Sequence, residues 1–129
     1  MVVKVGIFLP LSTMLTPGND KIAKQPPEYG EIMLFLRKHL LGYDKNIVET
    51  FKYMTIFYEY RGKGICYLHQ KDNYVYLGFT GKIKHPKLAA EGRKTIKVFK
   101  CFINKNIDVK SLNAILKDAC ALIDKKLKS

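Results

Sequence analysis

The segment MTIFYEYRGKGICYLHQKDNYVYLGFTG, residues 54–81, decides the fold of this chain. It is rich in Tyr, Phe, Ile and Val, the residue types that favour strands. Turn-forming residues interrupt it twice, at residues 61–64 and at residues 71–73. These two interruptions divide the segment into three strands joined by tight turns, which predicts an antiparallel meander.

The segment after the meander predicts a further strand and a closing helix. GRKTIKVFKCFI, residues 92–103, is predicted to be the fourth strand, and residues 81–92 before it are predicted to be a loop that Pro86 breaks. Residues 106–129 predict a helix with Asp108 as its N-cap. Its apolar residues recur at helical spacing: Leu112, Ile115, Leu116, Ala119, Leu122 and Ile123.

The segment before the meander predicts a helix at residues 26–43, with prolines at its entry and Gly42 at its end. Its apolar stripe has helical spacing: Ile32, Phe35, Leu36 and Leu40. Residues 44–54 are predicted to form a second short helix or a turn. A run of strands framed by helices predicts a single two-layer α+β domain, with an antiparallel sheet of about four to five strands and the N-terminal and C-terminal helices on one face.

The length of 129 residues suits one domain, which we place at residues 20–129. Residues 1–19 are interpreted as an N-terminal extension, either a mis-assigned start or a disordered segment, and residues 1–13 are expected to have no structural weight. The alternative is an added edge strand from Val2 to Leu9. The apolar run from Val5 to Leu11 is too short to span a bilayer, so no membrane is expected as a partner.

Charge is the unusual feature of the composition, since 23 Lys and Arg face 11 Asp and Glu, for a net charge of +12. Such a balance favours polyanionic partners, including nucleic acid. Against this, the arginines that best recognise phosphate are only Arg37, Arg61 and Arg93, and surplus lysine is also an ordinary way to solvate a surface. The cysteines, Cys66, Cys101 and Cys120, have neither disulfide nor zinc spacing, which predicts reduced thiols in the cytoplasm.

No motif for catalysis, metal binding or a cofactor stands out. The sequence has no Gly-x-Ser-x-Gly, no phosphate-binding Gly-Lys-Ser/Thr loop and no paired carboxylates on its strands. Glu59 is expected to pair across a turn with Arg61 and Lys63. Cys66 and His69 are three residues apart on a strand and so point to opposite faces. We therefore predict a protein that is not an enzyme and that holds no metal and no cofactor.

Residues 81–100 are the most basic stretch, with seven basic side chains against Glu91 alone. Alternation along the strand predicts that Ile96 and Val98 face the core, and that Thr95, Lys97 and Phe99 face the other way. In the turn at residues 91–94, backbone N–H groups and two cations could meet an anion. A solvated loop is the alternative.

Tyrosines crowd the meander at Tyr53, Tyr58, Tyr60, Tyr67, Tyr74 and Tyr76. Aromatic rings beside cations can stack nucleobases. They also fill the core of a small sheet and cover its open face, and we favour that interpretation.

Several of these residues together resemble a known pattern. Its elements run from an aromatic through Gly-Lys, Cys-Tyr, Leu-Gly-Phe and His-Pro to Glu-Gly-Arg-Lys, here Tyr53, Phe57, Gly62-Lys63, Cys66-Tyr67, Leu77-Gly78-Phe79, Gly81, His85-Pro86, Leu88 and Glu91-Gly92-Arg93-Lys94. Over Asp20 to Leu127 the chain is similar to the bacterial YdhG-like domain-of-unknown-function family. It departs from that pattern at Tyr53, where the family often has Trp, and at Ile56, where it often has Pro. The resemblance implies a frataxin-like fold and, for some members, an iron-chaperone role.

From these observations we expect a non-catalytic binding module with a basic, aromatic-lined surface for an unidentified anionic ligand or partner. Its expected site residues are Tyr53, Phe57, Phe79, His85, Arg93 and Lys94. Arg93 and Lys94 would hold the anion, and the aromatic rings would form an apolar wall. The alternatives are an intracellular iron chaperone that needs Glu28 and Glu31, a nucleic-acid-binding protein, and an enzyme that needs His85 or Arg93.

Overall fold

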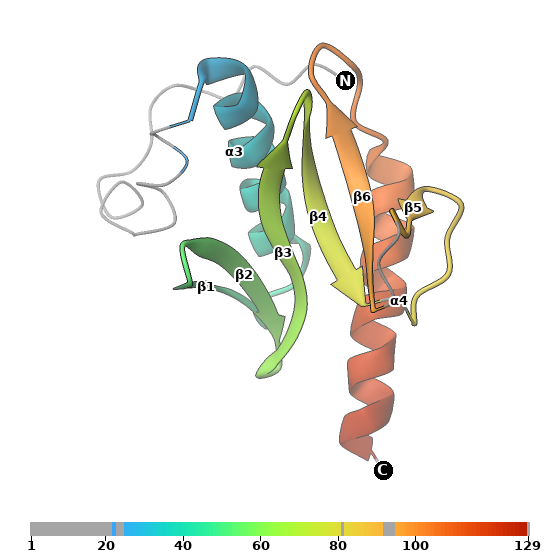
Figure 1. The fold of residues 1–129 in the computed structure, drawn as a ribbon. Helices are drawn as coiled ribbons and strands as arrows, with labels where there is room; N and C mark the ends of the chain where they lie inside the picture. Colours follow the sequence, from blue (N-terminus) through green and yellow to red (C-terminus); the bar gives the residue numbers. More distant parts are fainter. Residues whose placement is uncertain (1–21, 23–24, 81, 92–94, 129) are drawn as a thin grey trace.

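The computed structural model describes residues 22, 25–80, 82–91 and 95–128. Its fold is α+β, as the sequence predicts (Figure 1). The elements in chain order are α3 (Pro27–Tyr43), β1 (Ile47–Lys52), β2 (Thr55–Tyr60), β3 (Lys63–Lys71), β4 (Tyr74–Thr80), β5 (Leu88–Ala89), β6 (Ile96–Phe102) and α4 (Val109–Lys128). The strands form one sheet in the order β1-β2-β3-β4-β6-β5, and every neighbouring pair is antiparallel.

The described part of the sheet has six strands, one more than the upper end of the predicted range. The prediction of a helix or turn at residues 44–54 is wrong, because Ile47–Lys52 forms strand β1 and pairs with β2. The β-branched residues Ile47, Val48 and Thr50 favour that extended conformation. The second added strand, Leu88–Ala89, lies inside the predicted loop and has only two residues.

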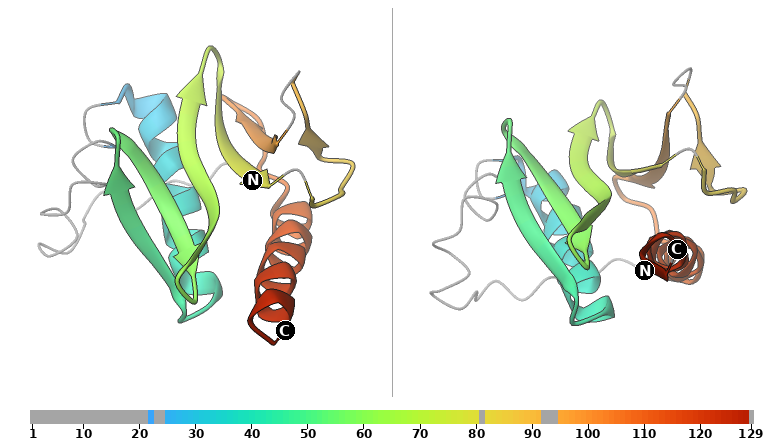
Figure 2. Two further views of the ribbon diagram at one scale, coloured as in Figure 1. Left: turned by 60° about the horizontal axis from the view of Figure 1, so that its bottom comes forward. Right: turned by 90° about the horizontal axis from the view of Figure 1, so that it is seen from below.

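Both helices pack on one face of the sheet, as predicted (Figures 1 and 2). The helix-covered face of the sheet contributes one set of side chains to the core, including Ile56, Leu68, Leu77 and Phe99. The predicted stripes of the helices contribute the other set: Leu36 and Leu40 from α3, and Leu112, Ile115, Leu116, Ala119 and Ile123 from α4. The opposite face of the sheet, which we call the open face, carries no helix of the described chain.

The predicted facing of β6 is reversed in the structure. Phe99 and Cys101 belong to the core, whereas Val98 is buried outside the core cluster, on the open face. The reason is the register with β4, which places Phe99 beside the core residue Leu77 and Val98 beside Gly78. Lys97 also points to the helix-covered side, where its Nζ donates a hydrogen bond of 3.1 Å to the carbonyl of Ile83.

The two predicted tight turns of the meander are confirmed. Positive φ angles mark both, at Arg61 and Gly62 (52° and 83°) and at Asp72 (48°). The expected ion pair of Arg61 with Glu59 is wrong, because Arg61 instead pairs with Asp124 of α4 at 2.7 Å. Arg61 sits in a turn whose left-handed backbone directs its side chain away from its strand neighbours and towards the helix.

The helix ends follow local chemistry. The predicted N-cap Asp108 is confirmed, since its carboxylate accepts hydrogen bonds from the Ser111 backbone N–H at 3.0 Å and the Ser111 hydroxyl at 2.7 Å. The helix predicted at residues 26–43 is confirmed as Pro27–Tyr43, but Gly42 does not end it, because the C-cap is Asp44. The described helices are all too short or too polar to cross a membrane. The predicted extension at residues 1–19, with its alternative strand, lies outside the described residues.

Candidate functional site

Of the six residues expected from the sequence to form a site, the four that the structure describes do not form one cluster. Tyr53 lies in the turn between β1 and β2 and is 91% exposed. Phe57 lies on the open face, whereas Phe79 is fully buried beneath the helices. His85 lies in the loop between β4 and β5, where its Nδ1 accepts a hydrogen bond from the backbone N–H of Lys87 at 3.1 Å. Arg93 and Lys94 lie outside the described residues.

The open face instead gathers a different set of rings. Strand pairing places Phe57 beside Tyr67, His69 beside Tyr76, and Tyr74 beside Phe102. We call these six residues the aromatic row. None of the six belongs to the core cluster or to the apolar residues packed against it. The favoured interpretation of the tyrosines therefore holds for most of them, since Tyr58 and Tyr60 fill the core and those of the row cover the open face. Tyr53 does neither, because it is exposed in a turn.

Ring contacts join the aromatic row across four strands. The ring centroids lie 6.1 Å apart for Phe57 and Tyr67, and 5.9 Å apart for Tyr67 and Tyr76. The next separations are 6.0 Å for Tyr74 and Tyr76, and 5.3 Å for Tyr74 and Phe102. His69 meets the edge of Tyr76 at 5.9 Å. These distances lie in the range for favourable aromatic pairs, so the row is one contact chain from β2 to β6.

Gly78 packs directly against one ring of the row, that of Tyr67. A Cβ atom at this position would lie 2.2 Å from Cε1 of Tyr67, so any larger residue would collide with that ring. Tyr67 pairs with Gly78 across β3 and β4, and Val98 pairs with Gly78 on the other side. The missing side chain thus leaves room for the Tyr67 ring to pack closely over the β4 backbone.

The row keeps solvent access although parts of it are buried. Tyr76, at its centre, is only 5% exposed, whereas Phe102, at its end on β6, is 37% exposed. Phe57, Tyr67 and Tyr74 have intermediate exposure. The sheet therefore holds the rings of Phe57, Tyr67, Tyr74 and Phe102 on one side, and part of each of these residues remains accessible to solvent.

Cations lie along the same face. The Nζ of Lys100 lies 5.0 Å from the centroid of the Tyr74 ring, which is a cation–π geometry, and also forms an ion pair with Glu91. By strand alternation Lys52 and Lys71 point to this face as well, and both are exposed. Of the acidic residues in the described strands, only Glu59 shares this facing.

A cavity of about 330 Å³ adjoins the end of the row, between the β5–β6 edge and the loop that follows β6. We call it the edge cavity. Lys100 and Phe102 line it together with Lys87, Lys105 and Asp108. The hydrogen bonds from Ser111 hold the pKa of Asp108 below its usual value, and the nearby Lys87 and His85 lower it further. The cavity is therefore a mixed site with more cations than carboxylates.

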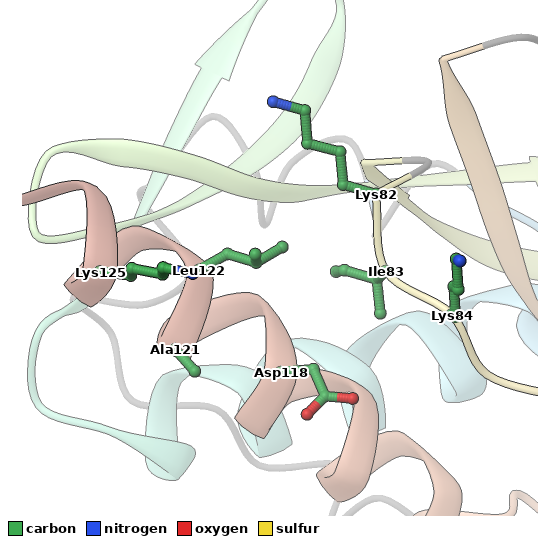
Figure 3. A pocket seen from close by; sticks show the side chains of 7 residues that line it. All are labelled: Lys82, Ile83, Lys84, Asp118, Ala121, Leu122 and Lys125. Atoms are coloured by element: carbon green, nitrogen blue, oxygen red, sulfur yellow. The ribbon is translucent and has the colours of Figure 1, made fainter.

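A second cavity, of about 380 Å³, lies between α4 and the segment after β4 (Figure 3). Lys82, Lys84 and Lys125 line it around Asp118. Figure 3 shows the side chains of Lys82 and Lys84 directed away from Asp118 and from each other. Since its cations do not converge on one point, this cavity is a weaker candidate for an anion than the edge cavity.

Ionisable groups beneath the helices form a structural cluster. The Oε2 atom of Glu49 accepts hydrogen bonds from Arg37 Nε at 2.8 Å and from the Tyr58 hydroxyl at 2.9 Å. Burial and then the charge of Glu49 raise the pKa of Tyr58 well above its usual value. Arg37 lies on α3, Glu49 on β1 and Tyr58 on β2, so this cluster joins the helix to the two strands.

The cysteines are free thiols whose reactivity is suppressed by burial. Burial raises the pKa of Cys66 and raises that of Cys101 to about 12. Burial and the nearby Asp44 and Asp124 raise the pKa of Cys120 to about 11. Within the described ranges, no three His, Cys, Asp or Glu side chains gather closely enough to hold a metal ion.

Sequence reasoning found Phe57 but missed the rest of the row as a unit. The signal was present in the parity of residues along the strands, because Tyr67, His69, Tyr74 and Tyr76 alternate with the core residues Leu68, Val75 and Leu77. Comparison of this chain with protein-family models, with curated proteins and with solved structures finds no match in any of the three.

Proposed function

We propose that this protein is a non-catalytic binding module and that it binds single-stranded nucleic acid on the aromatic row. The observation that carries the proposal is the unbroken contact chain of rings from Phe57 to Phe102, on a sheet face that no described helix covers, with Lys100 over Tyr74. An aromatic sheet face bordered by cations provides both interactions that unpaired strands need.

Base stacking supplies the first interaction. Successive unpaired bases can stack on aromatic side chains, and each stack contributes about 1–3 kcal/mol without demanding a particular base. Tyr74 and Phe102 are the best placed for this, because they lie at the more open end of the row. Duplex bases are already stacked and paired, so a duplex cannot use these rings in the same way.

Phosphate contacts supply the second interaction. Lys71 and Lys100 border the rings, and the whole chain carries a net charge of +12. This surplus attracts polyanions at long range, and the contacts themselves release counterions from the nucleic acid. The scarcity of arginine agrees with binding that depends on stacking and charge rather than on bidentate base contacts.

The proposal is compatible with membership of the YdhG-like family, which we retain as part of it together with a cytoplasmic location. The three free, buried cysteines agree with a reducing compartment. The iron-chaperone role implied for some members would need clustered carboxylates, and the described part of the chain contains no such cluster. No observation therefore favours iron over an organic anion.

The test is fluorescence anisotropy of labelled single-stranded and double-stranded DNA and RNA of one sequence, titrated over a range of salt concentrations. Single strands should bind more tightly than duplexes, and about four phosphate contacts would give a log–log salt slope near −3. Tyr74→Ala with Phe102→Ala should weaken single-strand binding by about tenfold or more.

Tyr53→Ala is the matched control, because it removes an exposed aromatic ring outside the row. It should leave the affinity unchanged. Equal binding of duplexes and single strands, with no effect of the row variants, would contradict the proposal. A loss caused by Tyr53→Ala alone would instead move the site to the β1–β2 turn.

A further inference from the structure

We infer that the edge cavity holds the terminal phosphate of a bound single strand, so that the protein prefers one phosphorylated strand end. This inference rests on the proposed function, because the aromatic row must hold the adjoining bases. The inference assigns a binding site to one chemical group of the ligand, its terminal phosphate. Without that site, the aromatic row would bind any position along a strand.

The cavity exists because β5 is short. It has only two residues, and they pair with Phe99 and Val98 of β6. The remainder of β6, towards Phe102, has no described strand on that side. The loop before β5, with Pro86 and Lys87, forms one wall of the opening, and the segment after β6, with Lys105, forms the other.

The charges of the lining favour an anion. Lys87, Lys100 and Lys105 face a single lining carboxylate, Asp108. Both oxygens of that carboxylate already accept hydrogen bonds from Ser111 as the N-cap of α4. Neither Lys87 nor Lys105 forms an ion pair within the described ranges. These two cations are therefore available to a ligand, and Lys100 can share its charge between Glu91 and that ligand.

The cavity is continuous with the row through two shared residues. Phe102 lines the cavity and packs against Tyr74 in a tilted arrangement with the ring centroids 5.3 Å apart, and Lys100 lines it with its Nζ 5.0 Å from the centroid of the same Tyr74 ring. A base stacked on Tyr74 or Phe102 therefore has its phosphate within reach of the cavity. Such a ligand uses the rings and the cavity together.

Size and charge select a terminal group rather than an internal one. A volume of about 330 Å³ is at the lower end of the range of roughly 300–1,000 Å³ for small-ligand pockets, so it admits one small group rather than a length of strand. A terminal phosphate monoester carries about −1.5 to −2 charges at neutral pH, whereas an internal phosphodiester carries about −1. The lining lysines therefore match a terminal phosphate better.

The experiment compares three versions of one labelled oligonucleotide: 5′-phosphorylated, 3′-phosphorylated and without a terminal phosphate. The wild-type protein should bind one of the phosphorylated forms about tenfold more tightly than the other two. Lys87→Gln with Lys105→Gln should abolish that gain and leave the affinity for the unphosphorylated form within about twofold. Lys38→Gln with Lys117→Gln, on exposed positions of the two helices, removes the same charge and should preserve the gain.

Equal binding of the three oligonucleotides by the wild-type protein would overturn the inference and leave the proposed function intact. A uniform loss for all three in the Lys87 and Lys105 variant would also overturn it, because these lysines would then contact internal phosphates. If no version binds at all, the proposed function fails, and the inference fails with it. Thermal melting of each variant checks that the fold is retained.

Discussion

On the helix-covered face of the sheet, Tyr58 and Phe79 are fully buried, whereas on the open face Tyr74 and Phe102 keep part of their rings in solvent. The buried rings belong to one core cluster together with side chains from both helices. The open-face rings pack mainly against one another across strands. The same residue types thus occur on both faces with different neighbours.

We expect folding stability and ligand binding to depend on different faces of the sheet. The free energy of folding should come chiefly from the helix-covered face. Hydrophobic stabilisation is roughly proportional to the apolar area removed from water, and the helices cover that face. Rings on the open face contribute cross-strand contacts of about 0.2–1 kcal/mol each, and their uncovered surface remains for a ligand. Substitutions on the two faces should therefore separate folding from binding.

The largest expected effect is that of Leu77→Ala, at the centre of β4 on the helix-covered face. Leu77 is fully buried and belongs to the core, so truncation should reduce the free energy of unfolding by about 2–5 kcal/mol. Tyr74→Ala, on the open face of the same strand, should cost only about 1 kcal/mol. Urea unfolding followed by circular dichroism measures both, and equal losses would contradict the proposed division between the faces.

The second effect concerns the contact between Gly78 and Tyr67. Gly78→Ala places a methyl group where the Tyr67 ring lies, so the ring must move away from the sheet. Overpacking of this kind typically costs about 1–3 kcal/mol, and we expect about 2 kcal/mol with a loss of single-strand binding.

A double-mutant cycle isolates that contact. With Tyr67→Ala present, Gly78→Ala should cost much less in urea unfolding, because the colliding ring is gone. If Gly78→Ala reduces the free energy of unfolding equally in both backgrounds, its effect arises in the β4 backbone itself and not from the contact with the Tyr67 ring.

The fold could be predicted from the sequence wherever the local sequence pattern agrees with the tertiary environment of the segment. The meander, its two turns and the stripes of both helices follow from alternation, turn chemistry and helical spacing. Strand β1 was missed because its turn is formed by Tyr53 and Met54, at φ angles of 53° and 60°. Such turns usually contain Asn or Gly, so no turn residue marked the hairpin.

The candidate site was harder to predict from the sequence, because its composition depends on the register between strands. Val98 and Phe99 are both apolar, and only the pairing of β6 with β4 decides which of them joins the core. The same pairing brings Phe102 to Tyr74 and Lys100 to the row. Basic residues along residues 81–100 were visible in the sequence, but their neighbours were not.

A third effect tests whether polar contacts also distinguish the faces. Tyr58→Phe removes the hydroxyl that donates to Glu49 at 2.9 Å and retains the buried ring. Since hydrogen bonds to charged groups contribute about 1.5–3 kcal/mol, we expect a loss of about 1.5 kcal/mol in urea unfolding. Tyr67→Phe, on the open face, is the matched comparison for stability. Its expected effect is smaller because Tyr67 is partly exposed to solvent, and a larger loss there would contradict the assignment of structural polar contacts to the helix-covered face.

The smallest effect lies at the rim of the helix-covered face, where Asp124 of α4 accepts hydrogen bonds from Arg61 and the Tyr60 hydroxyl. The hydrogen bond from Arg61, followed by that from Tyr60, holds the pKa of Asp124 below its usual value of 3.8.

A carboxyl with a lowered pKa in the folded protein stabilises it at neutral pH, and that contribution is lost as the pH falls through the folded pKa. The difference in urea midpoint between wild type and Asp124→Asn should therefore be small but measurable at pH 7, and should disappear as the pH falls below the usual carboxyl pKa and through the lowered pKa of the folded protein. Asp118→Asn removes the same charge from an exposed position on α4 without an ion pair within the described ranges, so it should change the midpoint at pH 7 less than Asp124→Asn does. Equal shifts for the two variants would mean that only net charge matters, and that the contact between α4 and the β2–β3 turn contributes nothing to this face.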